Sequence, residues 1–96
     1  MPCIKRTLQA NEDLIEVWEY IHLQNPAAAE DETVHSLHKA CLNLAYFPHS
    51  APLREEFGEE VRCHPVKNYV LLYKPLSDGI LLLRVVHCAR YLPGLI

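Results

Sequence analysis

The sequence predicts an α+β domain in the order β-α-α-β-β-β, with a helical hairpin packed on an antiparallel sheet. Residues 8–25 and 26–47 repeat apolar side chains at three- and four-residue intervals, which indicates two amphipathic helices. Beyond residue 60 three short apolar runs are separated by turn residues, which indicates an antiparallel meander of strands. With 96 residues, the chain is expected to form a single domain over residues 1–96.

The N-terminal part is expected to form an outer strand and then the first helix. Residues 3–8 are a short apolar stretch. Thr7 stands at the N-cap position, where its hydroxyl can accept an amide of the first turn. The apolar stripe of the helix consists of Leu14, Trp18 and Ile21. The helix is expected to end near Asn25.

The second helix has recognisable ends. Asn25 is a favourable N-cap, and Pro26 suits the first helical position, where its missing N–H costs nothing. Phe47 precedes Pro48 and is therefore pushed out of the helical region. Because the two helices have almost no linker, they are expected to form an antiparallel hairpin. Residues 49–60 are polar and are expected to form a loop.

Strands are expected at residues 61–66, 69–74 and 80–87, joined by short turns. Both faces of the last two are apolar. One face carries Tyr69, Leu71 and Tyr73 of one strand, and the other carries Val70 and Leu72 of that strand with Leu82 and Val86 of the next. One helical hairpin covers one face of such a sheet. The other face is expected to be an exposed interface, the alternative being that the first strand and the C-terminal tail fold over it.

Composition narrows the function classes. Residues 8–47 contain seven acidic residues and one base, Lys39, whereas residues 61–96 contain five basic residues and one acid, Asp78. This asymmetry is compatible with a basic working surface or with solvated faces. Residues 1–6 are not followed by an apolar signal-peptide region, and no apolar run approaches the ~20 residues of a membrane span. A cytoplasmic protein without membrane contact is therefore expected.

The cysteines and histidines are candidate ligands of a metal site. Four cysteines in a cytoplasmic protein are expected to be thiols. Candidate ligands are Cys63-His64, His87-Cys88, and His35, His38 and Cys41. The first and third strands of a meander lie ~10 Å apart, and the usual zinc-site spacings do not occur. No metal or other cofactor is expected.

Several local patterns, in this order, are similar to the ParE/RelE toxin superfamily. The first helix resembles that of ParE-like toxins through Asp13-Leu14-Ile15 and Trp18-Glu19-Tyr20-Ile21. The turn between the helices resembles theirs through Asn25-Pro26-Ala27-Ala28-Ala29. The strands are similar through Val61-Arg62, Pro65-Val66, Asn68-Tyr69, Leu72-Tyr73, Asp78-Gly79-Ile80, Arg84-Val85-Val86-His87 and Ala89-Arg90.

The resemblance implies a toxin of a type II toxin-antitoxin system, neutralised by a ParD-like antitoxin encoded beside it. ParE-like members are associated with inhibition of DNA gyrase, and RelE-like members cut messenger RNA in the ribosome. Matched to the RelE pattern, expected lysines fall on Gly58-Glu59-Glu60, and an expected arginine falls on Val70. The ParE branch is therefore favoured, with gyrase as the target, no catalysis, and DNA contacted only through the antitoxin complex.

Two groups of residues are the candidate sites. The candidates for contacting the target are Arg62, His87 and Arg90. The candidates for binding the antitoxin are Arg84, Val70, Leu72, Leu82 and Val86. The alternatives are a RelE-type ribonuclease that uses Arg62, Arg90 and His64 or His87, and a degenerate toxin that serves as a co-repressor. An ion pair of Arg62 or Arg90 with a nearby acid, and a structural role for His87, are the competing interpretations of single residues.

Overall fold

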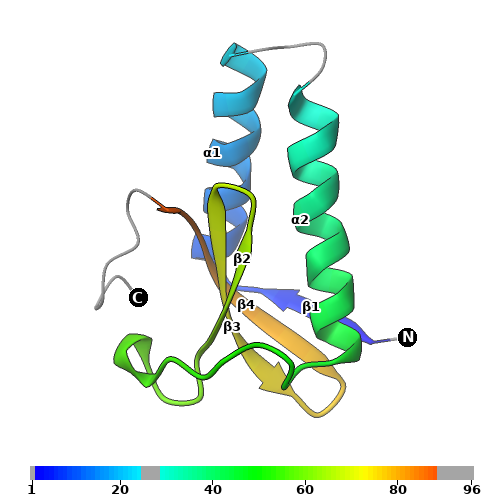
Figure 1. Ribbon diagram of the computed structural model, residues 1–96, viewed down its shortest axis with the longest axis vertical. Coiled ribbons are helices and arrows are strands. Elements are labelled where there is room, and N and C mark those ends of the chain that lie inside the picture. Colours follow the sequence, from blue (N-terminus) through cyan, green and yellow to red (C-terminus); the bar gives the residue numbers. More distant parts are fainter. Residues whose placement is uncertain (1, 25–28, 89–96) are drawn as a thin grey trace.

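The computed structural model describes residues 2–24 and 29–88. Strand β1 (Cys3–Arg6) is followed by helices α1 (Leu8–Gln24) and α2 (Ala29–Tyr46), the short 3-10 helix η1 (Glu55–Phe57), and strands β2 (Arg62–Val66), β3 (Tyr69–Leu76) and β4 (Gly79–His87). Figure 1 shows the two helices side by side against one face of the sheet. The α+β class and the order of the six predicted elements are confirmed. The predicted cap at Asn25-Pro26 lies outside the described residues.

The sheet is mixed, with strand order β1-β4-β3-β2. The meander of β2, β3 and β4 is antiparallel, as the short turns predict. β1 is an outer strand, and it runs parallel to β4 because the two helices return the chain to the same end of the sheet. The antiparallel sheet expected from the sequence is therefore corrected at this one strand.

The start of α1 follows from the sequence. The Thr7 hydroxyl oxygen accepts the Ala10 N–H at 3.0 Å, which is the predicted N-cap. The same hydroxyl donates to the Leu83 carbonyl oxygen at 2.8 Å, so the cap also ties the helix to β4. Within the described residues, no helix is long and apolar enough to cross a membrane.

Two apolar clusters lie on opposite faces of the sheet. The larger cluster lies under the helices, and its most deeply buried members on the strands are Leu71, Tyr73, Ile80 and Leu82, each 0% exposed. The smaller cluster lies on the other face and consists of Phe57, Val61, Cys63, Val70, Leu72 and Val86. Tyr69, Leu71 and Tyr73 face the helices and Val70 and Leu72 face away, as the alternation of the sequence predicts.

Gly79 begins β4 and pairs with Cys3, the first residue of β1. Its φ is 156°, and a Cβ on this residue would overlap the Cys3 carbonyl group. The absence of a side chain lets β1 approach, and the Cys3 N–H then donates to the Asp78 carbonyl oxygen at 2.6 Å. The glycine predicted for a hairpin turn therefore also allows the parallel pair to form.

Candidate functional site

The second face of the sheet is covered by the chain itself. Val70, Leu72 and Val86 lie on that face, as predicted, but they are 5%, 0% and 4% exposed. Phe57 and Val61, from the connection after α2, pack against them. The expected exposed interface is therefore wrong for these three residues, because Phe57, from the segment predicted to be a polar loop, and Val61, predicted to begin the first strand of the meander, form a second core with them.

Leu82 does not lie on the second face. Tyr73 pairs with Leu82 while the preceding residue, Leu72, pairs with Arg84, so Leu83 is an extra residue in β4. Such a β-bulge reverses the alternation beyond it. Leu82 therefore lies in the larger cluster under the helices with no exposed area, and its proposed contact with an antitoxin is withdrawn.

Arg84, next to the bulge, has an intramolecular partner. Its guanidinium Nε donates to Asp13 Oδ2 at 2.7 Å, and Nη2 donates to Asp13 Oδ1 at 3.2 Å. The Val85 N–H also donates to Asp13 Oδ2, at 3.0 Å. The hydrogen bond to Asp13 raises the pKa of Arg84 above its usual range. Asp13 thus joins α1 to the irregular part of β4. Arg84, which the sequence suggested as a contact for the antitoxin, binds Asp13 within the chain.

Arg62 fixes the connection that follows α2. Its Nη1 donates to the Ala51 carbonyl oxygen at 2.6 Å and reaches the His49 carbonyl oxygen at 3.4 Å. Its Nε is buried with no hydrogen-bond partner among the described residues. Tyr73 Oη donates to the Pro48 carbonyl oxygen at 2.8 Å, and burial raises the pKa of this phenol. The acceptors of Arg62 are backbone carbonyl oxygens, and not the nearby acidic side chains that the sequence offered as partners of an ion pair.

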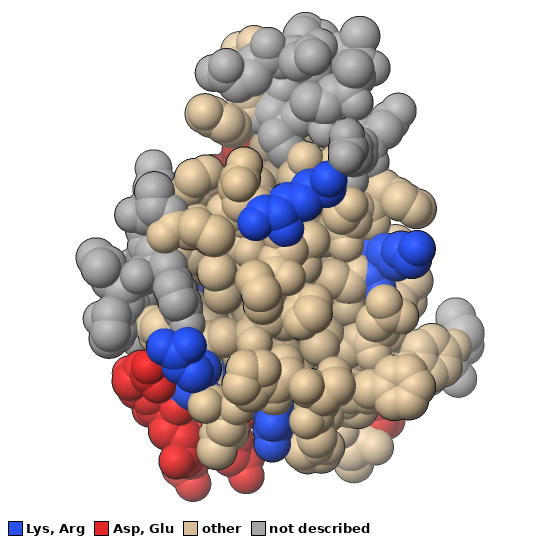
Figure 2. Space-filling model, in the orientation of Figure 1, with Lys and Arg blue, Asp and Glu red and all other residues tan. Residues whose placement is uncertain are grey.

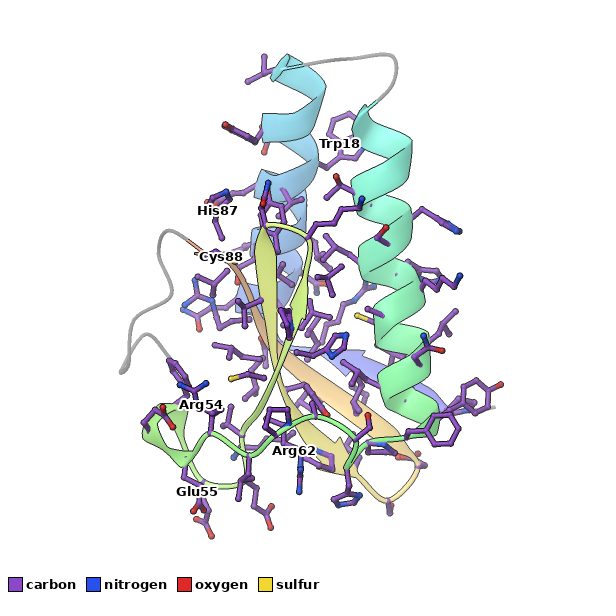
Figure 3. All side chains as sticks on the ribbon, in the orientation of Figure 1. Trp18, Arg54, Glu55, Arg62, His87 and Cys88 are labelled. Atoms are coloured by element: carbon purple, nitrogen blue, oxygen red, sulfur yellow. The ribbon has the colours of Figure 1, made fainter. Side chains whose placement is uncertain are left out.

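The two described target-contact candidates, Arg62 and His87, lie apart on the sheet. Arg62 pairs with Tyr73 in the middle of β3, and His87 pairs with Tyr69 at the start of β3. Four residues of strand separate these positions, which is ~13 Å. Figure 3 shows the two labelled side chains far apart. His87 is exposed, with its ring edge-on to Tyr69 at a centroid distance of 5.3 Å, and Arg90 lies outside the described residues.

The basic bias of the C-terminal half does not form a continuous patch on the face in view. Figure 2 shows the basic side chains separated by uncharged surface. The acidic side chains gather at one corner, over η1 and its neighbours. The exposed acids of this corner are Glu55, Glu56, Glu59 and Glu60. Arg54 is paired with Glu56 at 2.7 Å and lowers the pKa of that carboxyl.

An apolar groove runs between the two helices. It has a volume of about 770 Å³, and β1 and β4 form part of its wall. Its lining residues are mainly apolar: Ile4, Leu14, Ile15, Val17, Trp18, Val34, Leu37, Cys41 and Leu82, with Arg6, Asn11 and His38. Ile15 and Trp18 are 59% and 43% exposed in it. Figure 3 shows Trp18 directed from α1 toward α2.

The groove is the feature that the sequence analysis missed. Its signal was the width of the apolar part of α1, where Ile15 flanks a stripe that already includes Leu14 and Trp18. A helix that buries one stripe against a sheet does not need this second row. The excess marks a surface that another chain can cover.

The sequence matches one protein family. The family described as the ParE toxin of the type II toxin-antitoxin system parDE matches residues 4–91. None of the curated proteins matches the sequence. Among solved structures, the chain is similar to one described as "Chromosomal ParDE TA system from P. aeruginosa", with 16% identity, a TM-score of 0.74, and coverage of 91% of this chain and 96% of that chain. At this identity the similarity shows the fold alone.

Within the described residues, no three His, Cys, Asp or Glu side chains converge in a way that could hold a metal ion. Cys3, Cys41, Cys63 and Cys88 are thiols and not disulfides. Cys41 lies in the wall of the groove, and burial raises the pKa of its thiol, partly opposed by the charge of Arg6. The groove is therefore a site for apolar contact and not for thiolate chemistry.

Proposed function

The chain belongs to the ParE toxin family of type II toxin-antitoxin systems, and from this we propose that it inhibits DNA gyrase and is neutralised by a ParD-like antitoxin. The groove between α1 and α2 carries the proposal for the antitoxin. We assign to it an amphipathic helix of that partner. The toxin acts in the cytoplasm, and it meets DNA only through the antitoxin complex.

The shape and chemistry of the groove suit a helix. Its lining is apolar, and Ile15 and Trp18 keep about half of their surface exposed in the chain alone. Amphipathic helices bind such grooves with side chains spaced three and four residues apart. Burial of an exposed tryptophan is a frequent source of binding energy at interfaces. A partner helix would therefore gain most of its affinity from contacts around Trp18.

Charges beside the groove restrict the partner further. Glu12, Glu16 and Glu19 are exposed and form a row along α1 next to Ile15. Arg6 lies in the groove wall at the β1 side. A partner helix that carries basic residues along its α1 side and an acid near β1 would match these charges.

The positions of the candidate residues support inhibition by contact over RNA cleavage. Cleavage needs a base, cations and an acid within reach of one phosphate. Arg62 donates to a backbone carbonyl oxygen, and His87 pairs with Tyr69, four residues along β3 from Tyr73, the residue that pairs with Arg62. Contact of Arg62, His87 and Arg90 with the target stays a prediction.

The proposal is tested with the purified chain and the ParD-type protein encoded beside its gene. We expect inhibition of gyrase supercoiling by this chain, relieved by an equimolar amount of the partner. Cleaved messenger RNA with intact supercoiling would contradict gyrase inhibition and favour the RelE-type alternative. A folded chain with no effect on growth, supercoiling or RNA would favour a co-repressor.

Replacement of Trp18 tests the groove. Trp18→Ala is expected to weaken partner binding at least about tenfold, because a central interface tryptophan is lost, while the chain stays folded. Tyr46→Ala removes another exposed aromatic side chain, 59% exposed and outside the groove, and is the matched control. Equal affinities of the two variants for the partner, measured by calorimetry, would contradict the assignment of the antitoxin helix to the groove.

A further inference from the structure

The C-terminal end of α2 exposes two adjacent aromatic side chains. Tyr46 is the last residue of α2 and Phe47 is the next residue, and they are 59% and 67% exposed. Neither of them lines the groove between the helices. Single exposed apolar side chains are common, but large ones that lie together mark contact surfaces. The end of α2 is therefore a second surface at which another protein can bind.

The backbone that carries these two rings is held in place. The Phe47 N–H donates to the Asn43 carbonyl oxygen at 2.9 Å. The Phe47 carbonyl oxygen accepts the Ser50 N–H at 3.1 Å and the Ser50 hydroxyl at 2.8 Å. The next carbonyl oxygen, that of Pro48, accepts the Tyr73 hydroxyl at 2.8 Å. Because the turn is already ordered, a partner that covers the rings loses little affinity to ordering them.

The two rings continue an exposed row of α2. Members of this row are three or four residues apart, so they lie on one side of the helix, and all of them are exposed. We call these residues the α2 row: His35, Lys39, Asn43, Tyr46 and Phe47. The groove is lined from α2 by other residues: Val34, Leu37, His38 and Cys41. One helix thus presents one set of side chains to the groove and a different set to the solvent.

Charge restricts what the α2 row can bind. Residues 33–53 contain no acidic residue, and they contain Lys39 and three histidines. Figure 2 shows the acidic side chains in view gathered mainly at the corner of η1, which lies on the other side of the molecule from α2. An acidic surface is therefore attracted to the row and meets no like charge on this helix. One lysine is too few for a nucleic acid, whose binding usually engages several cations with phosphates. The row fits an acidic protein surface.

We propose that the α2 row is the surface by which this toxin holds its protein target, and that the target covers Tyr46 and Phe47 with an acidic surface. The inference rests on the proposed function, in which the target is gyrase. α2 carries both the row and one wall of the groove, so an antitoxin helix in the groove lies beside the row. A helix with its side chains is ~10 Å wide, which is enough to keep a large target surface away. Neutralisation follows from this exclusion, without contact between the antitoxin and the two rings.

Inhibition of gyrase supercoiling by increasing amounts of the chain tests the proposal. The double variant Tyr46→Ala/Phe47→Ala should need at least about tenfold more protein for half inhibition, because two aromatic contacts are lost. Tyr20→Ala is the matched control, since Tyr20 is a tyrosine of α1 that is 58% exposed and lies outside the groove. This control should inhibit as the unaltered chain does. Equal inhibition by the double variant and the control would overturn the assignment of the row.

Antitoxin binding by the same chains separates the two surfaces. The double variant should bind the ParD-type protein encoded beside the gene with unchanged affinity, which also shows that it is folded. Trp18→Ala should behave in the opposite way, with full inhibition of gyrase that the ParD-type protein relieves poorly. Loss of antitoxin affinity in the double variant would place the α2 row inside the antitoxin interface and would also overturn the assignment.

Charge reversal tests the acidic nature of the target surface. Lys39→Glu should need several times more protein for half inhibition, and the dependence of inhibition on salt should fall, because an attraction is replaced by a repulsion. Lys5→Glu makes the same change in net charge at an exposed position of β1 and should leave inhibition unchanged. Equal effects of the two reversals would contradict an acidic surface on the target.

The last experiment asks whether the two partners exclude each other. Immobilised gyrase should retain the chain alone and should not retain its complex with the ParD-type protein. A ternary complex would overturn neutralisation by exclusion. If the unaltered chain inhibits gyrase and the double variant inhibits equally well, only this inference fails. If the unaltered chain does not inhibit gyrase, the proposed function fails and this inference fails with it.

Discussion

The two faces of the sheet reach similar degrees of burial with very different coverings. One face lies under α1 and α2, which have 17 and 18 residues and contribute residues from several turns to the larger cluster. The other lies under one connection, in which Phe57 of the three-residue η1 and Val61 provide the contacts. Leu82 on the first face and Leu72 on the second are both 0% exposed. A regular hairpin and an irregular segment therefore exclude water equally well.

The coverings differ in what holds them in place. α1 is attached to β4 through its N-cap and a side chain of its second turn: Thr7 binds the Leu83 carbonyl oxygen, and Asp13 binds Arg84 and the Val85 N–H. The connection is attached through backbone acceptors, with Arg62 donating to the Ala51 carbonyl oxygen and Tyr73 to that of Pro48. The helical covering leaves an apolar groove between its two helices, whereas the connection leaves its face closed. The comparison teaches that the proposed recognition surface lies between two elements of a covering, and not on an uncovered face of the sheet.

The largest expected effect comes from placing a charge in the core under the helices. Leu82→Asp should unfold the chain, costing about 5 kcal/mol or more in free energy of unfolding, because the carboxylate would be buried without a partner. Circular dichroism at 25 °C measures this. Leu53→Asp, at a side chain that is 45% exposed, is the control and should stay folded. A folded Leu82→Asp chain would contradict the position of Leu82 in the larger cluster. It would favour the position on the second face that the sequence predicted.

The second prediction concerns the irregular covering. Phe57→Ala should lower the free energy of unfolding by about 3 kcal/mol, the lower end for a buried phenylalanine, because a short surface segment can partly collapse into the space. Urea denaturation measures the loss. Phe47→Ala, at a side chain that is 67% exposed, should change stability by less than about 0.5 kcal/mol. If the two variants were equally stable, the second cluster would not be a core.

The smallest expected effect comes from the attachment of α1 to the bulge. Asp13→Ala should cost about 2 kcal/mol, because Arg84 and the Val85 N–H lose their acceptor in a place where both side chains of the ion pair are less than one-fifth exposed. The exposed neighbour Glu12→Ala is the control in the same denaturation experiment, with a loss below about 0.5 kcal/mol. A loss for Asp13→Ala no larger than that of the control would show that the bulge is held by the sheet alone.

Most of the fold could be predicted because it is encoded locally. The periodicity of residues 8–47, the cap at Thr7 and the short turns after β2 and β3 each specify an element from a few neighbouring residues. The direction of β1 was not predictable in this way. Its pairing with β4 depends on where two helices return the chain and on the space left by Gly79, which are properties of the assembled sheet.

The candidate site was predicted poorly for a related reason. Assigning Leu82 and Val86 to one face assumed an unbroken alternation through β4, and the single extra residue at Leu83 separates them. The irregular register is accompanied by contacts from Thr7 and Asp13, more than 70 positions earlier in the chain. No local pattern in the sequence of β4 indicates this bulge, because the residues that bind it lie in another part of the chain.

The sequence by itself determined the class, the order of elements, the inner face of β3 and the family, because propensity, periodicity and turn chemistry act over a few residues. Only the tertiary structure decided which apolar residues are buried in the core and which stay exposed in the groove. Val70, Leu72 and Val86 are buried by η1 and its neighbours, whereas Ile15 and Trp18 stay exposed in the groove. The physical reason is that burial depends on what packs against a side chain, and a sequence pattern shows the side chain without its neighbour.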